Sequence, residues 1–285
     1  SLLGSSVWAG LVERDWALER RDRDGKSVGE ELVRTGFNGT GVMPKPDLYL
    51  EIHIEGDSKM EQAGTRIAPY ARHWGAYKVR IEVTGEQNHT GPTPMEERKD
   101  AVLGAAYIIA KVRELAETAA DTLYTSVARV DISPNSPNIV PGKAILFAEL
   151  RSPEQAMLDW SLAELRKALP GLAARANVSA EIAAIDERPA GRFDPRLVKL
   201  TEQAADAFGY PRMELDTVGG HDAVAVNAIL PAIVIAVPSV NGVIHRNDEY
   251  TSPEDLAAGC DVFVDIVRRV DQAGGDLDKA VGANA

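Results

Sequence analysis

The chain has 285 residues, 45% of them hydrophobic and 26% charged, so it can bury the core of one large domain or of two ordinary ones. Its net charge of −12, with 31 basic and 43 acidic side chains, argues against nucleic acid or an anionic membrane as a partner. The sequence contains no apolar run long enough to span a bilayer. The single cysteine, Cys260, lies in an apolar helical pattern and is predicted to be a core residue. Because one cysteine cannot form an internal disulfide, we expect a cytoplasmic location.

The first 46 residues predict two helices. One is centred on Trp16 and Leu18, and the second begins at a Ser27 cap, with Glu30 as the capping-box acid, and ends near Gly36.

Residues 47–56 have the period of a strand with one face in a core. The apolar side chains are Leu48, Leu50, Ile52 and Ile54, and the other face carries Tyr49, Glu51, His53 and Glu55. A histidine between two carboxylates, just before Gly56 ends the strand, suits a metal ligand or an acid/base group. The alternative is a solvated face that happens to contain one histidine.

Residues 76–188 predict an inserted α+β domain. Its strands are expected at 77–84, 125–132, 143–150 and 178–185, with a helix from Thr93 to about Glu117 and another that starts at Pro153. This order, βαββαβ, is the split βαβ or ferredoxin-like arrangement. The flanking segments 1–75 and 189–285 are predicted to form one α/β domain.

The last hundred residues return to an α/β pattern. A helix is predicted over 195–208, stopped by Gly209, and a strand buried on both faces over 232–237. Ser252 is predicted to cap a final helix, and the residues after Gly274 are predicted to form a loose tail. The apolar face expected for that helix consists of Leu256, Cys260, Phe263, Ile266 and Val270.

Four of the five histidines lie in segments rich in Gly, Asn, Pro and acids, whereas His73 does not and is predicted to be structural. His53 and His245 are the best metal-ligand candidates, and acids that follow His245 suit its second ring nitrogen. His89 precedes the predicted helix start, where it would polarise a carbonyl or hold an oxyanion. The alternative for His89 and His245 is a surface histidine in a polar loop.

Three further positions suit binding of an anion or a small polar ligand. Arg151 ends a predicted strand and is able to grip a carboxylate with two parallel hydrogen bonds, although a surface ion pair with Glu149 or Glu154 is the commoner arrangement. Gly219 and Gly220 offer bare amides at a helix start, beside a His221 that either contributes to the site or only caps or packs. The segment Asn138–Gly142 predicts a tight turn.

Five segments together resemble a known family. They are Glu51-Ile52-His53-Ile54-Glu55, Asn88-His89-Thr90-Gly91 with Thr93 to Met95 and Arg98 to Ala101, Pro134-Asn135-Ser136 with Asn138 to Gly142, Gly220-His221-Asp222-Ala223, and His245 through Tyr250. The pattern resembles the amidase/hydantoinase/carbamoylase branch of the dinuclear-zinc peptidase and aminoacylase superfamily. Its members include N-carbamoyl-L-amino-acid hydrolases, beta-ureidopropionases and allantoate amidohydrolases.

The resemblance implies a catalytic α/β domain interrupted by a lid domain that also forms a homodimer. It implies two divalent metal ions, usually zinc and sometimes manganese, nickel or cobalt, with His53 and His245 each binding one. His89 would help to stabilise the tetrahedral oxyanion. Asn138 and Arg151 would bind the substrate, a small N-substituted amino acid, and the amides near Gly220 would add to the grip on its carboxylate.

The chain departs from the family pattern at two places. Gly56 and Asp57 stand where the family has Gln then Gly, which puts the carbamoyl group in doubt, and Thr217-Val218-Gly219 replaces Ser-Gly-Ala. The family's His-x-Asp pair, bridging Asp and Glu-Glu pair precede the Leu-Gly-Ser segment with which this chain opens, so we expect the chain to begin partway through a longer enzyme. The predicted function is hydrolysis of a linear carbamoyl or amide C–N bond. The alternatives are an aminoacylase or dipeptidase of the same superfamily, and a non-catalytic remnant that dimerises or binds a small acid.

Overall fold

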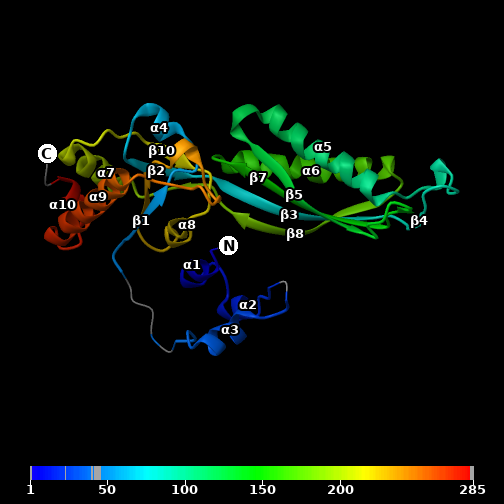
Figure 1. Cartoon of the computed structure of the whole chain (residues 1–285), viewed down its shortest axis with the longest axis horizontal. Coiled ribbons are helices and arrows are strands. Elements are labelled where there is room, and N and C mark those ends of the chain that lie inside the picture. The colour runs from blue at the N-terminus through cyan, green and yellow to red at the C-terminus, as the bar shows by residue number, and fades with distance from the viewer. Residues whose placement is uncertain (1, 23, 40, 42–45, 283–285) are drawn as a thin grey trace. The chain divides into compact units, whose positions relative to one another are not determined.

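The computed structural model describes residues 2–22, 24–39, 41 and 46–282 (Figure 1). The chain divides into two compact units, one formed by Ser1–His73 with Arg192–Ala285 and the other by Trp74–Gly191. Among the described helices, none combines the length and the apolar character that crossing a membrane requires.

The first unit is built on a mixed sheet with the strand order β1-β11-β2-β10. The strands are β1 (Tyr49–Ile54), β2 (Ala68–His73), β10 (Leu215–Thr217) and β11 (Ala232–Val237), and the short β9 (Gly191–Arg192) also pairs with β2. β1 runs parallel to β11, whereas β2 runs antiparallel to β11 and parallel to β10. Every residue of β11 is buried, which confirms the strand predicted over 232–237.

Helices cover both faces of this sheet. On one face α7 (Pro195–Phe208) and α9 (Pro253–Gln272) pack against each other, and α9 also contacts β1 and β11. A Cβ added to Gly259 of α9 would lie 3.4 Å from Ile52 Cγ2, so α9 covers the apolar face of β1. Because side chains alternate along a strand, Glu51 and His53 lie on the opposite face, toward α8 (Asp222–Val226).

Two predictions about the C-terminal segment are wrong. Cys260 and Leu256 are exposed, and α9 instead buries Ala258, Gly259, Val262, Ile266 and Val270. The small pair at 258 and 259 lets the helix approach β11 closely, and Leu256 and Cys260 lie on the outer side of the helix. The segment after Gly274 is not a loose tail, because α10 (Leu277–Gly282) buries Leu277 and Ala280 against α7 and α9.

The N-terminal segment forms three short helices, α1 (Leu3–Trp8), α2 (Arg14–Leu18) and α3 (Val28–Thr35), of which the first was not predicted. The capping box predicted at α3 is confirmed: Ser27 Oγ accepts from the Glu30 amide, and Glu30 Oε2 accepts from the Ser27 amide. Another short helix, α4 (Lys59–Ala63), follows β1.

Apart from two two-residue strands and two 3₁₀ turns, the second unit has the element order strand, helix, strand, strand, helix, strand. Its antiparallel sheet has the order β5-β7-β3-β8, formed by β3 (Gly75–Thr84), β5 (Tyr124–Ser133), β7 (Lys143–Ser152) and β8 (Ser179–Arg188). The helices α5 (Ala101–Ala119) and α6 (Gln155–Arg175) contact each other and lie on one face of the sheet (Figure 1). The core between them includes the fully buried Leu146, Leu150, Leu158 and Leu165.

The predicted start of α5 is wrong. Residues Met95–Glu97 form a single 3₁₀ turn, and the α-helix begins only at Ala101. Asp100 is the true N-cap, since its Oδ1 accepts from the amides of Val102 and Leu103 at 2.9 and 3.0 Å. The segment with Thr93 and Pro94 is held instead by Arg98, which donates to the carbonyl oxygens of Thr90 and Thr93.

Asp194 joins the cap of α7 to a bidentate ion pair, and this gives a pH-dependent prediction. Its carboxylate accepts from the Arg196 amide and from Nε and Nη2 of the same arginine. The Arg196 guanidinium holds the pKa of Asp194 below its ordinary value of 3.8. We expect Asp194→Asn, which keeps an N-cap acceptor, to lower the free energy of unfolding by about 1 kcal/mol at neutral pH.

This contribution is fully present above the unfolded pKa and is lost as pH falls through the lower folded pKa. Urea unfolding of both proteins should show a constant difference from about pH 5 to 8 that shrinks in acid. A difference that stays the same toward about pH 3 would show that the charge is not its source.

Candidate active site

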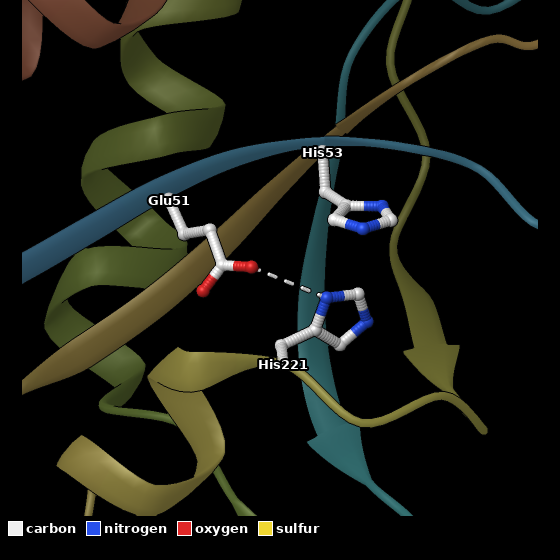
Figure 2. Close-up of side chains that lie close together, drawn as sticks. All are labelled: Glu51, His53 and His221. Atoms are coloured by element: carbon white, nitrogen blue, oxygen red, sulfur yellow. Dashed lines mark ion pairs between the residues drawn. The ribbon is translucent and has the colours of Figure 1, made fainter. Parts of the chain in front are cut away.

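Three side chains of the first unit form a group with metal-ligand chemistry: Glu51, His53 and His221. One candidate ligand atom from each lies within 4.8 Å of the others. Figure 2 shows Glu51 and His53 on β1 and His221 at the start of α8, with the two imidazole rings close together. The strand and the helix start are far apart in sequence, and the fold brings them side by side.

The tautomer of His53 is set by the backbone carbonyl of the next residue, Ile54. Its Nδ1 lies 2.7 Å from the carbonyl oxygen of Ile54, and a carbonyl only accepts, so Nδ1 carries the hydrogen. The neutral ring therefore has its free lone pair on Nε2. A backbone carbonyl on one ring nitrogen is the usual arrangement behind a metal-ligating histidine, so His53 fits a divalent metal ion.

His221 is buried, and both of its ring nitrogens face protein groups. Nε2 lies 2.7 Å from Thr217 Oγ1, and Nδ1 lies 3.4 Å from Glu51 Oε1. The other oxygen of Glu51 accepts from the Ala223 amide at 2.9 Å. Burial alone would raise the pKa of Glu51, but the contacts with His221 and Ala223 outweigh it and the pKa lies below the ordinary value. Glu51 is thus a carboxylate that accepts from the Ala223 amide and lies at ion-pair distance from His221.

His245 lies in the loop that follows β11, near the turn that follows β1. The loop begins with the 3₁₀ turn η3 (Val240–Gly242), and a Cβ on Gly242 would lie 2.7 Å from the carbonyl carbon of Asp57, so the two loops touch. His53 therefore lies at the carboxyl end of β1, and His245 lies in the loop that follows the carboxyl end of the neighbouring parallel strand β11. His245 is not a member of the group formed by Glu51, His53 and His221.

An acid was expected to accept a hydrogen bond from the ring of His245, but Glu249 does not do so. Its Oε2 accepts instead from the backbone amide of His245 at 2.8 Å. That bond fixes the backbone of the residue, whose φ is +58°, and leaves the exposed ring to other partners.

His89 and Asn138 come together in the second unit. The short strands β4 (Asn88–His89) and β6 (Ile139–Val140) pair antiparallel, and the Thr90 amide donates to the carbonyl of Asn138. The prediction that His89 precedes a helix N-terminus is wrong, because α5 begins at Ala101. Part of the turn predicted at 138–142 is β6.

The tautomer of His89 is also set by a backbone contact. The Gly91 amide donates to His89 Nδ1 at 3.0 Å, so this nitrogen is an acceptor and Nε2 carries the hydrogen. His89 is exposed, and its neutral ring presents an N–H donor to solvent. This is the tautomer that stabilising an oxyanion requires.

Arg151 lies on the sheet face opposite the helices. Its Nη2 donates to Glu149 Oε1 at 2.9 Å, so the ion pair considered as the alternative is present. In the same row of the sheet, Ala76 of β3 stands between Arg151 and Arg188 of β8. Burial, and next the charge of Arg151, lower the pKa of Arg188. The two arginines therefore influence each other electrostatically across a small residue.

Only part of the predicted anion site at the glycine pair has bare amides. The Gly219 amide donates to Thr217 Oγ1 at 3.2 Å, so it is already used, whereas Gly220 is exposed. Thr217 therefore connects this loop to His221. In the sequence, Thr217 stands out only as the first residue of the segment that departs from the family pattern. The sequence analysis placed Glu51 on the same strand face as His53, but only as one of the two acids that flank it.

Comparisons with known proteins cover all the segments that carry these residues. Residues 21–269 match peptidase family M20/M25/M40. The chain belongs to this family. It falls in the amidase branch, since it is 35% identical to an N-carbamoyl-L-amino-acid amidohydrolase of Rhizobium meliloti over 94% of its length. It is also 36% identical to a putative hydrolase of Mycolicibacterium smegmatis over 98% of its length.

A solved structure supports the same placement. The amidase of the hydantoinase/carbamoylase family from Burkholderia vietnamiensis superposes with a TM-score of 0.88 at 31% identity, covering 93% of this chain and 64% of the other. The chain spans 65% of the length of each of the two curated family members.

Proposed function

We propose that the protein is a metal-dependent hydrolase of a linear C–N bond, of the N-carbamoyl-L-amino-acid hydrolase type, acting on a small N-substituted amino acid. The observation that carries the proposal is His53 at the carboxyl end of β1, with its Nε2 lone pair free, in a member of the amidase branch of the family. The name of the Rhizobium meliloti relative supports a carbamoyl substrate.

His53 and His245 would each hold one of two divalent metal ions, zinc or else manganese, nickel or cobalt. Bound there, such ions supply Lewis acidity for the substrate carbonyl and for a water molecule. The loop that carries His245 touches the turn that follows β1, at Gly242 and Asp57. Of these metals, zinc and nickel are the ones that imidazole ligands suit best.

The other residues would bind and orient the substrate. His89, through Nε2–H, would donate to the oxygen that becomes negative as the carbonyl carbon turns tetrahedral. Asn138, Arg151 and the glycine pair Gly219–Gly220 would bind the substrate, with Arg151 on its carboxylate. We further propose that the second unit is a ferredoxin-like lid that also forms a homodimer, and that the enzyme is cytoplasmic.

A substrate panel tests the proposal. The full-length protein, loaded with zinc or manganese, is incubated with an N-carbamoyl, an N-acetyl and an N-aminoacyl form of one amino acid, and release of the free amino acid is measured. Preference for the N-carbamoyl form is expected. Preference for the acetyl or dipeptide form would instead identify an aminoacylase or dipeptidase.

Metal content distinguishes the remaining alternative. Elemental analysis of the purified protein should show bound divalent metal. No metal and no turnover of any of the three compounds would contradict the proposal and favour a protein that binds a small acid without chemistry.

A further inference from the structure

We propose that His221 is a positioning residue, which holds the His53 ring in the orientation that binds metal and does not itself contact the substrate. The proposal rests on the metal site of the proposed function and replaces the substrate-binding role predicted for His221. It follows from the group drawn in Figure 2 together with Thr217 and Ala223.

The orientation of His221 is fixed from both sides. Thr217 Oγ1 accepts from the Gly219 amide and lies 2.7 Å from His221 Nε2, within hydrogen-bond distance. Nδ1 faces Glu51 Oε1 at 3.4 Å on the other side of the ring. Glu51 is in turn held by the Ala223 amide. The ring of His221, 6% exposed, is therefore confined between Thr217 and Glu51.

The confined ring meets His53 edge to face. The ring centroids are 4.4 Å apart and the ring planes are inclined by 89°. His53 is held on its other side by the Nδ1 contact with Ile54 O. A ring confined in this way keeps its Nε2 direction without metal, so the protein need not order the side chain when metal binds.

Thr217 also connects His221 to the glycine pair Gly219–Gly220. Thr217 bonds both the Gly219 amide and the His221 ring, so one hydroxyl connects the proposed carboxylate loop with the support of the metal ligand. Loss of that hydroxyl should affect both sites. A residue that merely filled space in the core would not connect them.

The experiment measures zinc affinity of the full chain by competition with a chromophoric chelator. His221→Asn should weaken zinc binding by about 10- to 100-fold, the range for partners that orient a metal ligand. Thr217→Val should weaken it in the same direction, and Thr217→Ser should restore it. The control is His73→Asn, because His73 is as buried as His221 in the same unit but packs against Phe193.

A second measurement needs no metal. Long-range ¹H–¹⁵N spectra of the metal-free protein report the tautomer of each imidazole ring. His53 should be a single Nδ1–H form in the wild type and a mixture in His221→Asn. If the asparagine variant fails to fold, the Thr217→Val variant decides by both measurements.

The outcomes separate the inference from the function on which it rests. Unchanged zinc affinity and an unchanged His53 tautomer in the variants would overturn the positioning role while leaving the metal site intact. A wild-type protein that binds no zinc would contradict the proposed function, and the tautomer of His53 in the variants would then decide the positioning role.

Discussion

His53→Ala should weaken zinc binding more than about 100-fold and abolish hydrolysis. A residue that only orients a ligand costs up to about that factor, and removing a ligand should cost more. His53 is the metal candidate whose geometry is best defined, since the Ile54 carbonyl leaves Nε2 as its only acceptor. Chelator competition and turnover of an N-carbamoyl amino acid are the two measurements.

The control is the stability of the same variant. His53 is at the surface, so its loss should change the free energy of unfolding by no more than about 0.5 kcal/mol. His245→Ala should weaken zinc binding in a similar way, because each histidine would hold one ion of the pair. Full zinc affinity in His53→Ala would place any metal elsewhere in the protein and refute the role assigned to this residue.

Local patterns were sufficient for the elements whose ends are set by their own residues. Ser27 and Glu30 cap α3 by bonds to each other, and Gly209 ends α7 with a left-handed conformation that suits glycine. The all-apolar run of β11 is a strand buried on both faces. In each case the signal and the structure that it specifies lie within a few residues.

One error has a local cause and the other depends on a contact between distant segments. Thr93 and Pro94 look like a helix start, but Asp100 provides the cap and Arg98 holds the preceding loop. Cys260 fits an apolar stripe, yet α9 turns its small residues toward β11 because Gly259 allows a closer approach. Helical periodicity gives a face but does not say which of two adjacent faces packs best.

The site shows the same division. Alternation along β1 placed His53 on the face away from the core, and that placement holds. The support of His53 was not predictable, because the contact between Glu51 and the Ala223 amide joins residues 172 positions apart. The role of Thr217 depends on a single hydroxyl that meets His221 only in the folded chain.

Arg151→Ala should raise the KM for a carboxylate substrate by about 10- to 100-fold with a much smaller change in kcat. A hydrogen bond to a charged group contributes about 1.5–3 kcal/mol, and each 1.4 kcal/mol is tenfold in affinity. Binding that is equal in the ground and transition states appears in KM alone. Steady-state kinetics with an N-carbamoyl amino acid and with its carboxamide, which lacks the charge, should show the effect for the acid only.

The ion pair with Glu149 makes the competing explanation testable. If Arg151 serves only that pair, Arg151→Ala and Glu149→Gln should destabilise the second unit equally and leave KM unchanged. If Arg151 binds substrate, Glu149→Gln should lower KM, because it removes a carboxylate that competes with the substrate for the guanidinium. Arg151→Lys should restore little, since an ammonium cannot form two parallel bonds to a carboxylate. The opposite directions expected for KM in Arg151→Ala and Glu149→Gln therefore identify the substrate role without reference to the size of either effect.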